Sequence, residues 1–179
     1  MRMVRLITSI VFLFSTTHLF AQQYLSNNGE ISFFSNAPME DISAQNNKVS
    51  AIYDSDTKEL VFQLNIIDFV FPNSLMQEHF NENYLESDIY PKSTFTGKII
   101  NQDVAQTTVE GDLTIHGKTN KVKVEGDLNQ ENNTVNISSN FTVRLEDYDI
   151  KIPKLVMFKI AEMIDVKVTI ELKEIELIK

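Results

Sequence analysis

Residues 109–128, VEGDLTIHGKTNKVKVEGDL, contain two runs in which apolar and polar side chains alternate one by one. Such alternation is typical of a strand that turns one face to a core and the other to water. Between the runs lie Gly117, Lys118, Thr119 and Asn120, and both glycine and asparagine accept tight-turn geometry. The segment therefore predicts an antiparallel hairpin with one buried face and a turn over residues 117–120.

Alternation with the same period recurs on both sides of this hairpin. It runs over residues 60–66, 141–146 and 164–173. Its parity changes near Glu174, which predicts a bulge or a strand end there. Turn-forming residues separate the runs at 54–57 and at 129–133. We therefore expect a series of antiparallel hairpins within one all-β domain.

A domain with many half-buried antiparallel strands has two common architectures, the sandwich and the closed barrel, and both deal with exposed strand edges. A barrel of about eight strands has an interior that either fills with side chains or holds one small ligand. The last predicted strand, residues 164–177, would extend about 45 Å at ~3.3 Å per residue. That length favours a long barrel, although the pattern by itself leaves the sandwich open.

Residues 74–86 break the rhythm of the strands. Apolar side chains recur there at every fourth position, at Met76, Phe80 and Tyr84. Ser74 and Gln77 match the capping box that begins many helices. We therefore predict an amphipathic helix inserted between strands and packed across one opening of the barrel. A second, less regular helical turn is expected after Pro153.

Residues 1–21 are typical of a secretory signal peptide, with a basic start, an apolar stretch and a polar segment that ends at the small residue Ala21. Cleavage after Ala21 would leave residues 22–179 as one domain in the periplasm or outside the cell. The apolar stretch is shorter than the ~20 residues that span a bilayer, so we expect no integral membrane span after cleavage.

Composition and charge narrow the classes of function. The sequence has no cysteine, which leaves out disulfides, thiolate metal sites and a lipid anchor on a processed cysteine. Its formal net charge is −9, so the surface repels polyanions and we expect no nucleic-acid partner. Any lipid would be held by burial of its apolar part. Twelve phenylalanines accompany no tryptophan, and although core packing explains most single phenylalanines, their number favours a lined interior.

Four segments resemble signature blocks of the YceI-like proteins, and together they extend over most of residues 22–179. They are FFSNAPMEDISAQNNKVSAIYD (33–54), FPNSLMQEHFNENYLESDIYPKSTFTGKI (71–99), GDLTIHGKTNKVKVEGDL (111–128) and LEDYDIKIPKL (145–155). The resemblance implies an extended, lipocalin-like antiparallel β-barrel with an inserted helix and a periplasmic or secreted location. It also implies an interior that accommodates polyisoprenoid chains or related amphiphiles, and it supplies no catalytic residues.

One position departs from the family's pattern. The family commonly has glycine where this chain has Asp149, between Tyr148 and Ile150. If the backbone there needs a positive φ, aspartate adopts it at some cost.

Alternation and the helix stripe select ten side chains as candidates to line a lipid-binding interior. They are Phe33, Phe62, Leu64, Phe69, Phe71, Met76, Phe80, Tyr84, Phe95 and Val143.

Residues that could carry chemistry are few. His79 and His116 are the histidines outside the predicted signal peptide, and without metal-ligand spacing they indicate structural hydrogen bonding rather than a metal site. Arg144 lies on the polar parity of its run near Glu146, which predicts an exposed ion pair. The parts of a nucleophilic triad are missing, and we expect neither a cofactor nor a metal.

The leading hypothesis is therefore a non-catalytic barrel that binds and carries or stores an isoprenoid or other long-chain amphiphile. Two rivals stay open: a small barrel enzyme that acts on a lipid-like substrate, and an envelope interaction module whose apolar residues all pack in its core. The oligomeric state is also open, with a homodimer as one option.

Overall fold

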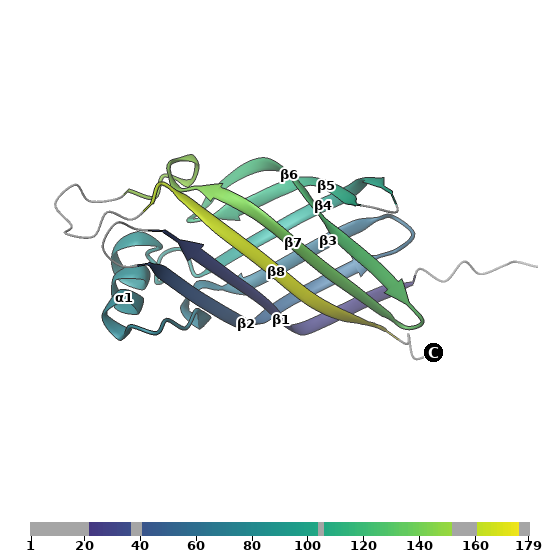
Figure 1. Ribbon diagram of the computed structural model, residues 1–179, viewed down its shortest axis with the longest axis horizontal. Coiled ribbons are helices and arrows are strands. Elements are labelled where there is room, and N and C mark those ends of the chain that lie inside the picture. Colours follow the sequence, from purple (N-terminus) through teal and green to yellow (C-terminus); the bar gives the residue numbers. More distant parts are fainter. Residues whose placement is uncertain (1–21, 37–40, 104–105, 152–160, 176–179) are drawn as a thin grey trace, which may run out of the picture.

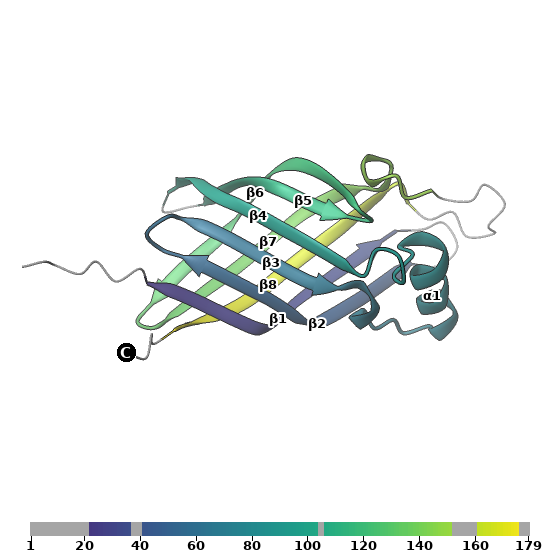
Figure 2. The same ribbon diagram turned by 180° about the vertical axis from the view of Figure 1, so that it is seen from behind.

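The structure is a computed structural model that describes residues 22–36, 41–103, 106–151 and 161–175. Eight antiparallel strands form a closed barrel (Figure 1). The strands are β1 (Gln23–Ser35), β2 (Ile42–Asp54), β3 (Glu59–Asn65), β4 (Lys92–Gln102), β5 (Thr107–Ile115), β6 (Lys118–Glu131), β7 (Thr134–Arg144) and β8 (Met163–Glu174). Figure 2 shows β3, β4 and β5 on the side of the barrel that lies behind β7 and β8 in Figure 1.

Each strand pairs with its neighbour in the sequence, and β1 also pairs with β8, with Ile31 opposite Val168. This last ladder joins the two ends of the sheet. The predicted barrel of about eight strands is therefore confirmed, and the sandwich alternative is wrong. The predicted strand end near Glu174 is also confirmed, because β8 ends at that residue.

The turns are tighter than the sequence analysis predicts. Between β5 and β6 only His116 and Gly117 form the turn, with φ angles of 51° and 73°, while Thr119 and Asn120 already belong to β6. Two successive positive φ angles are the mark of a two-residue type I′ hairpin, whose twist matches the flanking strands. The predicted turn over 129–133 likewise shrinks to Asn132 and Asn133, because β6 continues to Glu131.

The turn from β2 to β3 follows the prediction. The Asp54 carboxylate accepts hydrogen bonds from the backbone N–H groups of Asp56 and Thr57, at 3.0 and 2.9 Å. The bond from Thr57 is the largest cause that holds the pKa of Asp54 below its usual value. One side chain thus satisfies two backbone donors that the tight turn leaves without strand partners.

The predicted helix is present but divided into two parts. A short 3₁₀ turn, η1 (Ile66–Asp68), leads to α1 (Ser74–His79), and a π-helical turn, η2 (Phe80–Tyr84), continues it. Together they lie at one end of the barrel, opposite the end where the C-terminal part of β8 lies (Figure 1). Among the described residues, no helix is long and apolar enough to cross a membrane.

The capping box expected at Ser74 is wrong. The helix is capped one residue earlier, where the Asn73 side chain accepts hydrogen bonds from the N–H groups of Leu75 and Met76. Gln77 instead accepts a bond of 3.1 Å from the N–H of Phe71. The shift follows from geometry, because the side chain of the N-cap residue reaches the second and third helical N–H groups.

Both ends of the barrel are packed. At the end remote from α1, Tyr24 and Tyr53 stack with ring centroids 6.0 Å apart, and Val135 and Leu172 beside them are fully buried. The Tyr24 hydroxyl also accepts a 2.6 Å hydrogen bond from Gln130. At the α1 end, four phenylalanine rings form a cluster with centroids 4.9–5.7 Å apart; they are Phe33, Phe69, Phe71 and Phe80.

Three expectations fall outside the described residues. They are the signal peptide over 1–21, the helical turn after Pro153 and the last residues of the strand predicted to reach 177.

The two readings of the helix start make opposite predictions for a pair of variants. We expect Asn73→Ala to lower the free energy of unfolding by about 1 kcal/mol, since it removes the side chain that caps two N–H groups. Ser74→Ala, the matched control, should change it by less than about 0.5 kcal/mol. Urea unfolding followed by circular dichroism measures both, and a larger loss in Ser74→Ala would restore the capping box.

Candidate functional site

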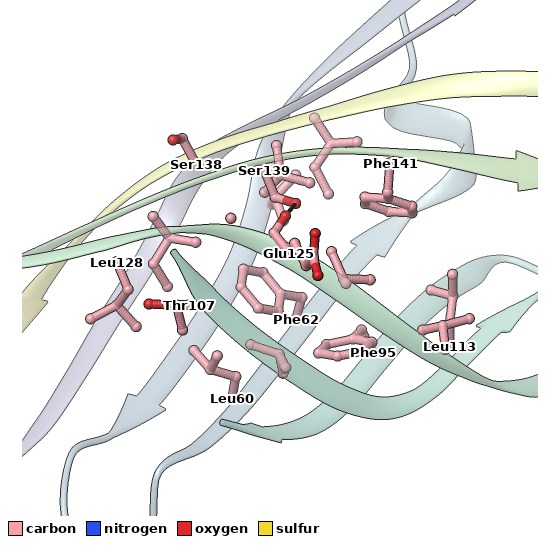
Figure 3. A pocket seen from close by; sticks show the side chains of 18 of the residues that line it. Leu60, Phe62, Phe95, Thr107, Leu113, Glu125, Leu128, Ser138, Ser139 and Phe141 are labelled. Atoms are coloured by element: carbon pink, nitrogen blue, oxygen red, sulfur yellow. Dashed lines mark hydrogen bonds between the residues drawn. The ribbon is translucent and has the colours of Figure 1, made fainter. Parts of the chain in front are cut away.

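Inward side chains of the strands surround two apolar cavities inside the barrel. The first, of about 120 Å³, is the wall cavity; it is lined mainly by β3 to β7, with Phe62, Phe95 and Leu113 among its walls (Figure 3). The second, of about 170 Å³, is the helix cavity; it lies between the strands and the segment from η1 to η2. These are the spaces in which a guest could be held.

The structure brings the ten predicted side chains together around these spaces. Phe62 and Phe95 line the wall cavity, and Leu64 lines both cavities. The helix cavity is lined by the others, namely Phe33, Phe69, Phe71, Met76, Phe80, Tyr84 and Val143. Their position is observed, whereas their role in binding a lipid stays a prediction.

A narrow region, which we call the waist, separates the two cavities. It consists of the side chains that line both of them: Ile31, Leu64, Ser93, Leu113 and Phe141. Ser93 is its one polar member, and its hydroxyl donates a 2.8 Å hydrogen bond to the carbonyl oxygen of Thr114. The waist therefore presents an apolar surface to both sides, because its polar group is already paired.

Leu113 and Phe141 were not among the ten predicted side chains, although both belong to runs of alternating apolar and polar residues. The alternation within a strand shows which side chains share a face, but it does not show which strands face each other across the interior. Selecting the apolar face of every strand would have found both residues, since the inward positions of β5, β6 and β7 also line the wall cavity.

Two glycines make room for the Phe95 ring. Gly97 and Gly111 lie opposite each other on β4 and β5. A Cβ atom on Gly97 would lie 2.4 Å from the Phe95 ring, and one on Gly111 would lie 2.5 Å from the Gly97 Cα. Neither distance is tolerable, so the absence of both side chains lets the ring lie against the wall of the cavity.

His116 connects three segments of the chain. Its Nε2 lies 2.8 Å from the Glu86 carboxylate, its Nδ1 lies 3.1 Å from the Tyr148 carbonyl oxygen, and its ring packs edge-on against Tyr90. The side chain is only 10% exposed. The structural role predicted for His116 is thus confirmed, since the ring ties the turn after β5 to the residues after η2 and to a 3₁₀ turn, η3 (Leu145–Tyr148).

The other residues singled out by the sequence lie away from the cavities. His79 is half-buried on α1 and lines neither of them. Arg144 points outward and pairs with Glu146 at 3.1 Å, as predicted. Asp149 adopts the left-handed conformation, with φ of 55°, at the position where the family commonly has glycine, and its carboxylate pairs with Lys118 at 2.9 Å. Within the part of the chain that is described, no three His, Asp or Glu side chains form a group that could hold a metal ion.

The pattern of the YceI-like domain matches residues 13–172 of this chain. The chain belongs to the YceI-like family. The family resemblance found in the sequence is therefore confirmed. No curated protein matches the sequence.

Solved structures of YceI-like and related proteins share the fold. BcnA from Burkholderia cenocepacia has a TM-score of 0.70 at 16% identity, with 80% of this chain and 95% of that chain covered. A polyisoprenoid-binding domain from Saccharophagus degradans, implicated in plant cell wall breakdown, has a TM-score of 0.73 at 11% identity, with 87% and 100% covered. The YceI protein of Campylobacter jejuni has 0.62 at 18% identity, with 98% and 100% covered. At these identities the likeness shows the fold alone.

Buried tyrosines predict that this YceI-like barrel loses stability in alkali. Burial is the main cause that raises the pKa of Tyr24, of Tyr84 and of Tyr148 above the usual value. A pKa raised by folding gives stability that is complete below the pKa of the unfolded chain, about 10, and is lost as the pH rises through the folded value. The unfolding free energy should therefore fall above pH about 10.

Tyr84→Phe tests this assignment, because burial is the one cause of the raised pKa at that residue. We expect the variant to lose less stability than the wild type between pH 9 and pH 11, approximate limits that bracket the tyrosine pKa. Urea unfolding across this range gives the measurement, and comparison of the two proteins at pH about 7 corrects for lost packing. Parallel pH profiles would show that Tyr84 does not contribute.

Proposed function

We propose that this chain binds an isoprenoid or another long-chain amphiphilic lipid inside the barrel, and that it carries or stores this lipid in the periplasm without catalysis. The observation that carries the proposal is the pair of apolar cavities that share the side chains of the waist. Apolar surface gains free energy when it leaves water, at about 0.8 kcal/mol per buried CH₂. A hydrocarbon chain is thus the guest that such an interior favours.

The volumes set the size of the guest. A cavity of about 150 Å³ in another protein accepts a benzene ring, and the two cavities here have about 120 and 170 Å³. As the side chains stand, the interior holds roughly a dozen carbon atoms on that scale. A longer polyprenyl chain requires rings such as Phe62, Phe95 and Phe141 to turn outward. The orientations of these three rings would therefore set which chain lengths bind well.

Two further observations support the ligand class and the location. The Saccharophagus degradans domain that shares this fold is described as polyisoprenoid-binding. Residues 1–21 have the composition of a secretory signal peptide, which supports export to the periplasm. A non-catalytic role is supported by His116, whose ring nitrogens are both engaged in structural contacts.

Chain length should control affinity. For a series of linear alcohols we expect the association constant to rise roughly fourfold per added carbon, as ~0.8 kcal/mol per CH₂ implies. The rise should flatten beyond roughly a dozen carbons, where the present cavity volume is filled. Isothermal titration calorimetry measures the series, and an affinity independent of chain length would contradict burial of the tail.

A tryptophan placed in the cavity should compete with the guest. Val109 lines the wall cavity, and Glu110, next on β5, is exposed on the outer surface. We expect Val109→Trp to weaken binding of the fluorescent polyene parinaric acid about tenfold or more, because the indole displaces at least two buried methylenes. Glu110→Trp, the matched control, should bind like the wild type.

Because the sequence has no tryptophan, the introduced residue also reports its own surroundings through its fluorescence. If Val109→Trp fails to fold, Val109→Phe gives a smaller obstruction at the same place. Equal affinity in a folded Val109 variant and in Glu110→Trp would place the guest outside the wall cavity.

Extraction of the purified protein with organic solvent, followed by mass spectrometry, tests the proposal against its rivals. We expect a prenyl or other long-chain amphiphile in the extract. An empty interior that binds no alcohol of the series, together with a protein partner on the outer surface, would favour the interaction module. Conversion of the bound lipid to a product would favour the enzyme.

A further inference from the structure

The barrel wall has an interruption between β6 and β7. The ladder between these strands has six residue pairs, from Gly126 opposite Ser139 to Glu131 opposite Thr134. Both strands continue past it, but residues 118–125 of β6 pair with β5 alone and residues 140–144 of β7 pair with β8 alone. Figure 1 shows β6 curving away from β7 over this stretch. We call the space between residues 121–125 and 140–144 the side gap.

Polar contacts limit the side gap at both ends. Where the strands separate, the Ser139 hydroxyl donates a 2.6 Å hydrogen bond to the carbonyl oxygen of Glu125, and Figure 3 shows these two residues side by side. At the other end, η3 lies beside β6, with a 2.6 Å hydrogen bond from the Asn120 amide to the carbonyl oxygen of Asp147. The gap is thus bounded at one end by the last pair of the β6–β7 ladder and at the other end by η3.

The wall cavity lies directly behind the point where the two strands separate. Inward side chains of both strands line it, such as Val124 and Phe141. Val122, Val124 and Phe141 are only half-buried, and they form an apolar floor behind the gap.

The ends of the barrel offer a less direct route. Tyr24, Val135 and Leu172 at the end remote from α1 have no exposed surface. The α1 end is closed by the phenylalanine cluster and by the hydrogen bond between Phe71 and Gln77. A guest that used either end would have to separate packed side chains. Passage through the side gap breaks no ladder hydrogen bond, because the facing backbone groups there are not paired with each other.

The two strand edges that face the gap also have features that prevent strands from pairing. Backbone N–H and C=O groups without strand partners need water, so we expect the edges of the gap to be hydrated. Lys121 and Lys123 alternate along the β6 edge, and exposed lysines are a common device that prevents edge strands from pairing. Hydrated edges above an apolar floor suit an amphiphile that passes tail first.

We propose that the lipid enters and leaves the barrel sideways, through the side gap between β6 and β7, and not through either end. This inference rests on the proposed function, since it describes the route to the same interior. It assigns to β6 and β7 a role in the rate of exchange, whereas the residues of the two cavities determine affinity.

A covalent bridge across the side gap tests the route. Continuing the register past Gly126 and Ser139 sets Lys123 opposite Thr142, and both are exposed. The chain has no cysteine, so Lys123→Cys combined with Thr142→Cys can be joined specifically by a short bis-maleimide. We expect the bridge to slow both binding and release of parinaric acid by at least about tenfold in stopped-flow fluorescence. The dissociation constant should change less than about twofold, because a blocked route alters both rates equally.

A matched control bridges paired strands. Glu110 lies directly opposite Lys123 in the β5–β6 ladder, so Glu110→Cys with Lys123→Cys carries the same bridge away from the gap and should exchange the probe at the wild-type rate. If the first pair does not react, Glu125→Cys with Asn140→Cys repeats the test one step on.

The outcomes separate the two proposals. Unchanged rates in a bridged protein that binds the probe would overturn the side route and leave lipid binding intact. Absence of binding in the unbridged wild type would overturn the proposed function itself, and the side route with it. Equal slowing by both bridges would show a general loss of flexibility and would likewise overturn a specific route through the gap.

Discussion

Closure of the sheet by the β1–β8 ladder is the constraint on which the rest of the molecule depends. In an open sheet the inward faces of β1 and β8 would lie at two separate edges, and each would need another layer to cover it. Closure directs the apolar faces of all eight strands towards one shared interior. The apolar side chains of the alternating pattern would form a shared core between two stacked layers in an open fold. In the closed barrel they line the inside of a tube.

The sequence predicted those features that depend on local periodicity. Strand parity, the helix after β3 and the strand end at Glu174 follow from side chains a few positions apart, and the family resemblance pointed to closure. The turn at His116 was missed because its length depends on distant partners, Glu86 and Tyr148, which hold the ring of a residue with positive φ. The cap at Asn73 was missed because Ser74, with Gln77 three residues later, matches the capping box, whereas Asn73 is followed at that spacing by Met76.

The candidate site shows a similar division. Phe62 and Phe95 were predicted correctly as cavity-lining side chains, because both are large and both lie on the apolar face of an alternating strand. The waist was not found as a unit, since Ile31, Leu113 and Phe141 come from β1, β5 and β7 and meet only in the closed barrel. The side gap could not be predicted from the sequence at all. The β6–β7 ladder stops at Gly126, but the alternation of apolar and polar residues along β6 continues unchanged.

The glycine pair on β4 and β5 has a consequence for how sequences of this barrel diverge. A side chain gained at Gly97 is compatible with the fold only when position 95 becomes smaller, whereas one gained at Gly111 would also meet the backbone of Thr96 and Gly97. Substitutions at positions 95 and 97 are thus coupled through excluded volume. Across relatives we expect them to covary, so that the width of the tube at this level is inherited as a single trait.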